Sequence, residues 1–249
     1  MTDWPYPRLV AHRGGGSLAP ENTLAAVRLG ASLGYRASEF DVKLSRDGVP
    51  FLLHDATLER TTDGKGVAGN LDWAALAALD AGSWHSAPYA GEPPPRLDAV
   101  VAFIRAGGLM ANVEIKPTPG LERETGLAVA RACATLWSGA PVAPLLSSFA
   151  FEALLAAREA APDLPRGWLI ETPGEADFER MERLGASALH CSHKAVTPAL
   201  VDRVHRGGRR LLAWTVNDAD RAARLLDEGV DTLVTDNLAV FAQRFGKQL

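Results

Sequence analysis

The chain has 249 residues, 47% of them hydrophobic, so it can bury a full core and has the usual length of one (β/α)8 barrel, about 250 residues. Thirty acidic residues against 26 lysines and arginines give a net charge of -4, without a basic stripe or aromatic ladder, which disfavours a nucleic-acid partner. Two cysteines are too few for a disulfide framework, and no apolar leader or run approaching ~18 residues is present, so we expect no membrane span and a cytoplasmic location.

Short apolar runs alternate with longer amphipathic segments along the chain, a pattern typical of β/α units around a parallel sheet. The expected strands are Arg8–His12, Ala37–Val42 (followed by Val49–His54), Leu109–Ile115, Val142–Ser147, Gly167–Ile170, Ala186–His190, Arg210–Trp214 and Thr232–Thr235. Eight such units most simply close into a TIM barrel, an α/β fold, formed as one domain over residues 1–249. A doubly wound open sheet is the alternative.

Helix signals fill the gaps between these strands. Apolar spacing predicts a helix over Asn22–Leu33, with Pro20 and Glu21 as its entry signal. Pro198 opens a later helix that Thr197 caps. The next helix is capped by Asn217 or Asp218 and stops at a glycine after Glu228.

One stretch after the second strand, approximately residues 56–95, breaks the regularity. It is rich in proline and glycine, yet it contains a short helical pattern from Trp73 to Leu79 and other large apolar residues. We interpret it as a small insertion with a hydrophobic side of its own. It is either a surface excursion packed on the barrel or a lid over a site.

Charged and titratable residues interrupt the apolar strands near their ends, where an unpaired buried charge would be costly. These residues are His12, Glu39, Asp41, His54, Glu114 and Lys116. Side chains two apart on a strand share a face, so Glu39 and Asp41 point the same way, as do Glu114 and Lys116. Because the carboxyl ends of the strands form the active-site face of a barrel, we expect these groups to meet at one mouth.

Three carboxylates at one site repel one another unless they are protonated or bridged by a cation. An all-oxygen set selects a hard ion, so Glu39, Asp41 and Glu114 are the expected ligands of one Mg²⁺ or Ca²⁺. Zinc is disfavoured because the cysteines are distant from these carboxylates and because the histidines are better placed for proton transfer than for metal binding.

Other rings lie near the expected mouth. Trp214 ends the seventh strand and Phe149 follows the fourth, so both are candidates to pack against substrate carbons, with packing at the rim as the alternative. His190 and His193 follow the sixth strand, where a structural role is favoured over contact with substrate. His85, in the insertion, and His205, on a helix face, are expected to take no part.

The chain resembles the glycerophosphodiester phosphodiesterases nearly from end to end. The matching motifs are HRG with PENT (His12–Gly14 and Pro20–Thr23), ExD (Glu39–Asp41), HDxxxxRTT (His54–Thr62), EIK (Glu114–Lys116) and WTVN (Trp214–Asn217). The insertion, with LDAGSWH and PPPRLDAV, is also similar to that of the family.

The resemblance implies a TIM barrel in which His12 and His54 are the general acid and base and Glu39, Asp41 and Glu114 hold a divalent cation. Arg13 and Lys116 would bind the phosphodiester. These expectations agree with residue chemistry, since histidine titrates near neutral pH and can exchange protons with substrate oxygens.

The implied reaction is hydrolysis of a small glycerophosphodiester, such as glycerophosphocholine or glycerophosphoethanolamine, to glycerol 3-phosphate and an alcohol. Either water attacks phosphorus directly, or the free glycerol hydroxyl attacks its own phosphate to form a cyclic intermediate; the sequence does not choose between them. The alternatives are a phospholipase D-like or phospholipase C-like enzyme on the same barrel, which would require a membrane-binding segment, and a non-catalytic scaffold. Oligomeric state is open.

Overall fold

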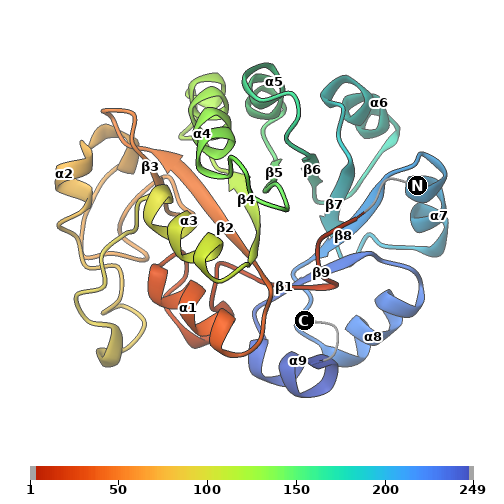
Figure 1. The fold of residues 1–249 in the computed structure, drawn as a ribbon, viewed down its shortest axis with the longest axis horizontal. Helices are drawn as coiled ribbons and strands as arrows, with labels where there is room; N and C mark the ends of the chain where they lie inside the picture. The colour runs from red at the N-terminus through yellow and green to blue at the C-terminus, as the bar shows by residue number, and fades with distance from the viewer. Residues whose placement is uncertain (1–3, 247–249) are drawn as a thin grey trace.

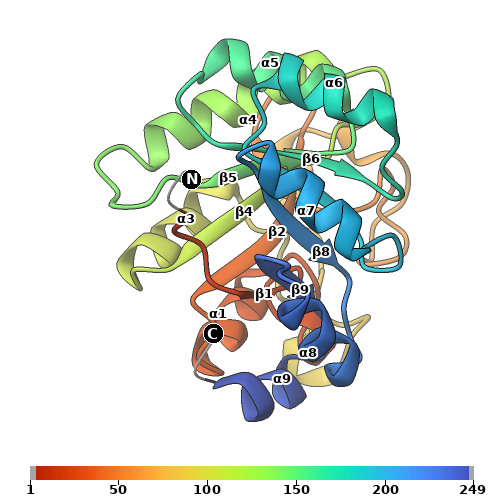
Figure 2. The same ribbon diagram turned by 90° about the vertical axis from the view of Figure 1, so that its right-hand side faces the viewer.

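A closed barrel of parallel strands forms the centre of the protein. The structure, a computed structural model, describes residues 4–246. Strand order in the sheet is β1-β9-β8-β7-β6-β5-β4-β2-β3, and β1 also pairs with β2, which closes the barrel through the register Ala11 to Ser38. Closure rules out the open doubly wound sheet. Figures 1 and 2 show the barrel along two perpendicular directions.

The strands are short and mostly buried on both faces, as expected of a parallel sheet covered by helices. Their bounds are β1 (Leu9–Ala11), β2 (Ala37–Leu44), β3 (Pro50–Leu52), β4 (Met110–Ile115), β5 (Leu145–Ser148), β6 (Arg166–Ile170), β7 (Ala188–Ser192), β8 (Arg210–Trp214) and β9 (Thr232–Thr235). Among the strands of residues 4–246, β3 alone is antiparallel; it extends the sheet from β2 and lies outside the eight-stranded barrel.

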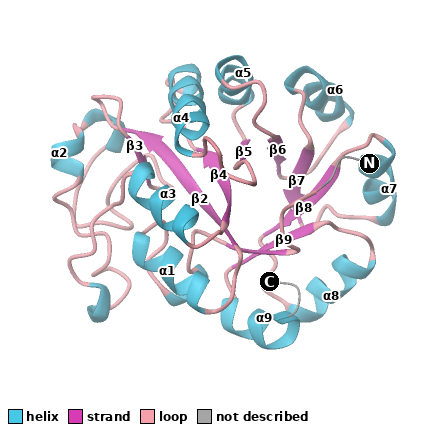
Figure 3. Ribbon diagram, viewed as in Figure 1, coloured by secondary structure: helices cyan, strands magenta, loops and turns pink. Residues whose placement is uncertain are grey.

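Helices surround the barrel, one after nearly every strand (Figure 3). Their bounds are α1 (Leu24–Ser32), α2 (Trp73–Leu76), α3 (Leu97–Ala106), α4 (Glu122–Leu136), α5 (Phe151–Ala160), α6 (Glu175–Leu184), α7 (Pro198–Arg206), α8 (Ala219–Asp227) and α9 (Leu238–Phe245). Thr197 and Asp218 cap α7 and α8 with side-chain hydrogen bonds to Leu200 N and Arg221 N. Of the two caps expected for α8, Asp218 is therefore the one used.

Two expected boundaries were wrong in ways that affect the site. Helix α1 begins at Leu24 and is capped by Thr23, because Asn22 adopts a left-handed conformation with φ 59° and uses its side chain elsewhere. Strand β7 runs to Ser192, so His190 lies within the strand instead of ending it. Other ends differ by a few residues; β5, for example, starts at Leu145, after Pro144, which has no N–H to donate to a ladder.

The segment over residues 56–95 contains α2 and two 3-10 helices, η2 (Ala68–Asn70) and η3 (Ala87–Tyr89). Its Leu58 and Leu76 form a small hydrophobic cluster with Phe51 of β3. In Figure 1, α2 lies outside the ring formed by the other helices. The segment contacts the first β/α unit, where Glu92 Oε1 accepts from Ala25 N at 3.0 Å. The expected helix of this segment ends at Leu76 instead of Leu79.

Within residues 4–246, none of the helices combines the length and apolar character that crossing a membrane requires. Cys133 and Cys191 are buried free thiols. Cys133 belongs to the main core between the helices and the barrel. Both cysteines thus serve in packing.

Candidate active site

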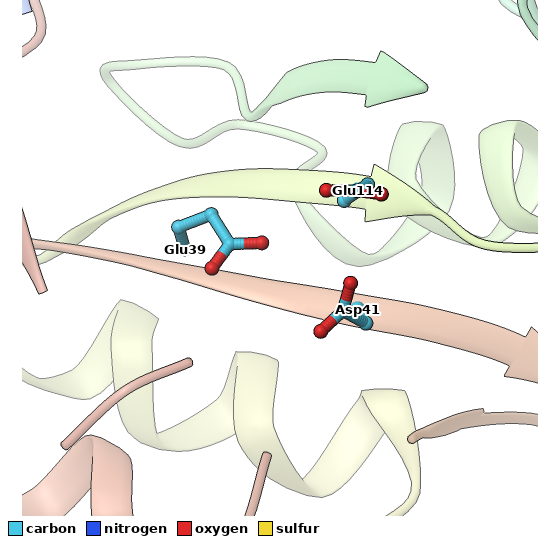
Figure 4. A group of neighbouring side chains, drawn as sticks. All are labelled: Glu39, Asp41 and Glu114. Atoms are coloured by element: carbon cyan, nitrogen blue, oxygen red, sulfur yellow. The ribbon is translucent and has the colours of Figure 1, made fainter. Parts of the chain in front are cut away.

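Three carboxylates face one another inside the barrel near its carboxyl end. Glu39 and Asp41 project from β2 and Glu114 projects from β4, and Asp41 is directly opposite Glu114 in the parallel register. One oxygen from each of the three lies within 4.8 Å of the others, and all three residues are buried (Figure 4). The alternation of side chains along β2 and β4 therefore brings together the residues expected from the sequence.

Burial and mutual repulsion disfavour three simultaneous negative charges at this point. Burial, with the nearby charge of Asp41, raises the pKa of Glu39 to about 7 and that of Glu114 to about 8. Burial would also raise the pKa of Asp41, but the charges of Lys116 and Arg13 outweigh it and lower that pKa. A divalent cation would relieve this repulsion, and the all-oxygen donor set fits Mg²⁺ or Ca²⁺.

Three basic side chains surround the carboxylates. Lys116 Nζ lies 2.6 Å from Glu114 Oε1 and 3.5 Å from Asp41 Oδ1, and Arg13 Nε lies 3.6 Å from Asp41 Oδ2. Lys43, on the same face of β2 as Glu39 and Asp41, is 1% exposed and donates from Nζ to Lys116 O at 3.0 Å. Burial lowers the pKa of Lys43 to about 8.

His12 is held by a carboxylate from the other end of the chain. It follows β1, which pairs with β9, and its Nδ1 lies 2.5 Å from Asp236 Oδ1. Its Nε2 lies 3.8 Å from Glu39 Oε2, on the side of the carboxylate cluster. Burial alone would lower the pKa of His12, but the hydrogen bond to Asp236 and the charges of Glu39 and Asp236 outweigh it and raise that pKa.

Asp236 is positioned in turn by backbone and by an amide side chain. Asn217 donates from Nδ2 to Asp236 Oδ2 at 3.0 Å and accepts from Asp236 N at 2.8 Å. The loop after β1 packs closely on the same residue: a Cβ on Gly16, whose φ is 55°, would lie 2.2 Å from Asp236 O. Glycine is therefore required there both by the backbone conformation and by the close approach.

His54 has the same kind of partner. Its Nδ1 lies 2.6 Å from Asp55 Oδ1, and Arg60 holds Asp55 from the other side, with Nε 2.6 Å from Oδ2. Arg60 also donates to Glu21, which accepts from Arg13 Nη1 at 2.7 Å. Burial, with the charge of Arg13, lowers the pKa of His54 despite the charge of Asp41. In both histidines the carboxylate on Nδ1 fixes the ring and leaves Nε2 for proton exchange.

Asn22 holds the central carboxylate from behind. Its Nδ2 donates to Asp41 Oδ2 at 2.8 Å, and its Oδ1 accepts from Asp41 N at 2.9 Å. This paired hydrogen bond explains the left-handed backbone of Asn22, because asparagine tolerates that region better than most residues. Glu21 and Asn22 thus organise the site through Arg13 and Asp41.

The carboxylates and histidines open on one cavity of about 110 Å³. Phe149 and Trp214 line it and pack edge to face, with ring centroids 5.4 Å apart. His190 lies at its floor with no exposed surface, and neither ring nitrogen has a hydrogen-bond partner among the described residues. Because burial lowers the pKa of His190 to about 3, the ring is neutral.

The structure brings together every side chain expected at the mouth; all of them line this cavity: His12, Arg13, Glu39, Asp41, His54, Glu114, Lys116, Phe149 and Trp214. His85 and His205 lie elsewhere, and each has another polar neighbour, Ser17 O and Asp231 Oδ2. His193 is not among the cavity residues.

Sequence reasoning missed Asp236 and Lys43. Asp236 directly follows the last strand, at the same end of the barrel as His12, so its position was a usable signal. Lys43 continues the alternation that singled out Glu39 and Asp41. His190 was placed near the rim, because its strand was expected to end two residues too early.

A barrel with two carboxylate-held histidines beside three clustered carboxylates at its carboxyl end has the arrangement of a TIM-barrel enzyme, since the carboxyl ends of the strands form the active-site face of that fold. Comparison with known proteins identifies the family. The model of the glycerophosphoryl diester phosphodiesterase family matches residues 12–240. The chain belongs to this family.

Individual relatives and solved structures are consistent with this family assignment. A glycerophosphodiester phosphodiesterase of Caldanaerobacter subterraneus subsp. tengcongensis is 31% identical over 233 residues, which cover 92% of this chain and 93% of the relative. A phosphodiesterase of Oleispira antarctica, solved in complex with the product sn-glycerol-3-phosphate, is 34% identical with a TM-score of 0.90 and 97% of each chain covered. A glycerophosphodiester phosphodiesterase from Agrobacterium tumefaciens matches with a TM-score of 0.79 at 26% identity, covering 95% of this chain and 99% of that one.

Proposed function

We propose that this protein hydrolyses small glycerophosphodiesters, such as glycerophosphocholine or glycerophosphoethanolamine, to glycerol 3-phosphate and an alcohol. The observation that carries the proposal is the pair of histidines, each held through Nδ1 by a carboxylate, at a cavity that also contains three clustered carboxylates. The names of the relatives and the product bound to the Oleispira antarctica enzyme support it. We further propose that residues 1–249 act as one phosphodiesterase domain and that the protein works in the cytoplasm.

His12 and His54 would serve as the general acid and base. A ring nitrogen of one accepts the proton of the attacking hydroxyl, and the other donates a proton to the departing alcohol oxygen. Asp236 and Asp55 keep the rings oriented and stabilise the imidazolium forms. This step needs groups that titrate near neutral pH, which the two histidines supply.

Arg13 and Lys116 would bind the phosphoryl oxygens, and Glu39, Asp41 and Glu114 would hold one divalent cation, Mg²⁺ or Ca²⁺. When bound, such a cation neutralises charge that develops on the phosphoryl oxygens. Trp214 and Phe149 would pack against the glycerol carbons. The cavity, at about 110 Å³, accommodates a small polar group and is below the usual volume of a pocket for a drug-sized ligand, roughly 300 Å³ or more.

The nucleophile is either water or the free hydroxyl of the glycerol next to the phosphate. In the first route water attacks phosphorus and the P–O bond to the alcohol breaks. In the second route the glycerol hydroxyl displaces the alcohol, giving a cyclic phosphate that water then opens. A diester without that neighbouring hydroxyl separates the routes, because comparable turnover of such a diester contradicts the cyclic intermediate.

The direct test measures glycerol 3-phosphate release from glycerophosphocholine by the purified protein, with chelator and after adding back Mg²⁺ or Ca²⁺. We expect metal-restored activity, lost in His54→Gln and retained in His85→Gln, a matched change at a histidine outside the cavity. Because general acid–base catalysis contributes roughly 10²–10⁴-fold, the His54 change should lower kcat at least about 100-fold. If neither glycerophosphocholine nor a glycerophosphodiester with an uncharged alcohol reacts in the presence of either metal, the protein is better interpreted as a non-catalytic scaffold.

A further inference from the structure

Beside the catalytic cavity lies a second, larger hollow, which we call the lysine groove. It measures about 490 Å³, and its walls come from the start of the insertion and from the loops after β4 and β5. It shares His54, Glu114, Lys116 and Phe149 with the cavity, so the two are continuous at these side chains. Lys43 lines the groove but not the cavity.

A phosphodiester has two halves, and the cavity, at about 110 Å³, is the smaller of the two continuous hollows. If the glycerol phosphate half occupies the cavity, the adjoining groove is the space left for the alcohol half. The preference of the enzyme among diesters then depends on the charges that line the groove.

Those charges disfavour a cationic alcohol. Lys43 and Lys116 lie side by side, since the register of β2 and β4 brings them together and Lys43 Nζ donates to Lys116 O at 3.0 Å. The two carboxylates of the groove already have partners: Asp55 binds His54 and Arg60, and Glu114 binds Lys116 at 2.6 Å. No lining carboxylate of the groove is therefore left to pair with an ammonium group.

The aromatic ring of the groove, Phe149, is 42% exposed but already has a lysine ammonium over it. A quaternary ammonium binds best against the open face of an aromatic ring. Phe149 already has Lys116 Nζ over its ring, 5.3 Å from the centroid, and Trp214 against it, at 5.4 Å between centroids. A cation on the cluster of Glu39, Asp41 and Glu114 would add positive charge next to the groove and strengthen the same preference.

We propose that the lysine groove binds the alcohol half of the substrate and that Lys43 makes it select an uncharged polyol over a cationic amino alcohol. This inference rests on the proposed function and narrows its substrate class. Lys43 is thus a specificity-determining residue.

The test compares kcat/KM for glycerophosphoglycerol, whose leaving alcohol is uncharged, with that for glycerophosphocholine, whose leaving alcohol is a cation. For the wild type we expect a ratio of roughly tenfold in favour of glycerophosphoglycerol, the size of a single poorly screened charge interaction. Lys43→Met should bring the ratio close to one, mainly by improving the choline substrate, whereas Lys65→Met, at an exposed lysine of the insertion, should leave it unchanged.

A second variant avoids the buried lysine. Thr57 lines the groove and is exposed, so Thr57→Asp adds a carboxylate with little risk to folding, and Thr57→Asn is its uncharged control. Thr57→Asp should improve the choline substrate severalfold relative to Thr57→Asn. The inference is overturned if the wild type turns over glycerophosphocholine as well as or better than glycerophosphoglycerol. It is also overturned if neither Lys43→Met nor Thr57→Asp changes the ratio of kcat/KM for the two substrates. Failure of both diesters to react overturns the proposed function itself, and this inference with it.

Discussion

His190 offers a quantitative test of the burial that the structure assigns to the barrel floor. The ring has no exposed surface, and burial lowers its pKa to about 3, against an unperturbed value near 6.5 in an unfolded chain. Between these values the unfolded chain takes up a proton at this position and the folded protein does not. The free energy of unfolding therefore falls as the pH drops below 6.5.

The magnitude follows from linkage. From pH 7 to pH 5, protonation of this one histidine stabilises the unfolded state by about 2 kcal/mol. The slope of the free energy of unfolding against pH approaches about 1.4 kcal/mol per pH unit from this group. Other groups also titrate, so the measurable quantity is the difference between wild type and His190→Leu. Denaturant unfolding at several pH values, with chelator present throughout, gives this difference directly.

Between pH 7 and pH 5 we expect the free energy of unfolding to fall by about 2 kcal/mol more in the wild type than in His190→Leu. From pH 8 to pH 7 the free energies of unfolding of the two proteins should change in parallel. Any constant offset between them, from the altered packing, does not affect the comparison. Parallel behaviour over the whole range would refute the reasoning, because it would mean that His190 is protonated as readily in the folded protein as in the unfolded chain.

Three further predictions concern the surroundings of the same cavity. Asp236→Asn should lower the His12 pKa, measured by NMR titration, and reduce kcat/KM roughly 100-fold; an unchanged titration would contradict the role of Asp236. Glu114→Gln should weaken Mg²⁺ or Ca²⁺ binding at least about tenfold by calorimetry, since it removes one of three anionic ligands, and undiminished affinity would place the cation elsewhere. Gly167→Ala puts a Cβ 2.2 Å from His190 Nε2 and should destabilise the fold by about 1–3 kcal/mol; His190→Ala in the same chain should relieve most of this, and simple additivity of the two changes would count against the contact.

The two histidine–carboxylate pairs differ in the sequence distance between their members. Asp55 is next to His54, so that pair is a local arrangement. Asp236 is 224 positions from His12 and reaches it only because β1 pairs with β9. Loss of the pairing between β1 and β9 would thus remove the support of one histidine and leave that of the other in place.

The sequence by itself determined the alternating β/α pattern, the shared face of Glu39 and Asp41, and the motif set that identifies the family. These features depend on local periodicity, because side chains two apart on a strand share a face in any sheet. Strand ends were less well determined, and an error of two residues moved His190 from the expected rim to the floor of the cavity.

Only the tertiary structure decided which distant groups meet. The pairing of β1 with β9 brought Asp236 to His12, and the register of β2 against β4 placed Asp41 opposite Glu114 and Lys43 beside Lys116. The physical reason is that strand register and closure arise from packing over the whole chain, whereas alternation along one strand is a property of a few residues.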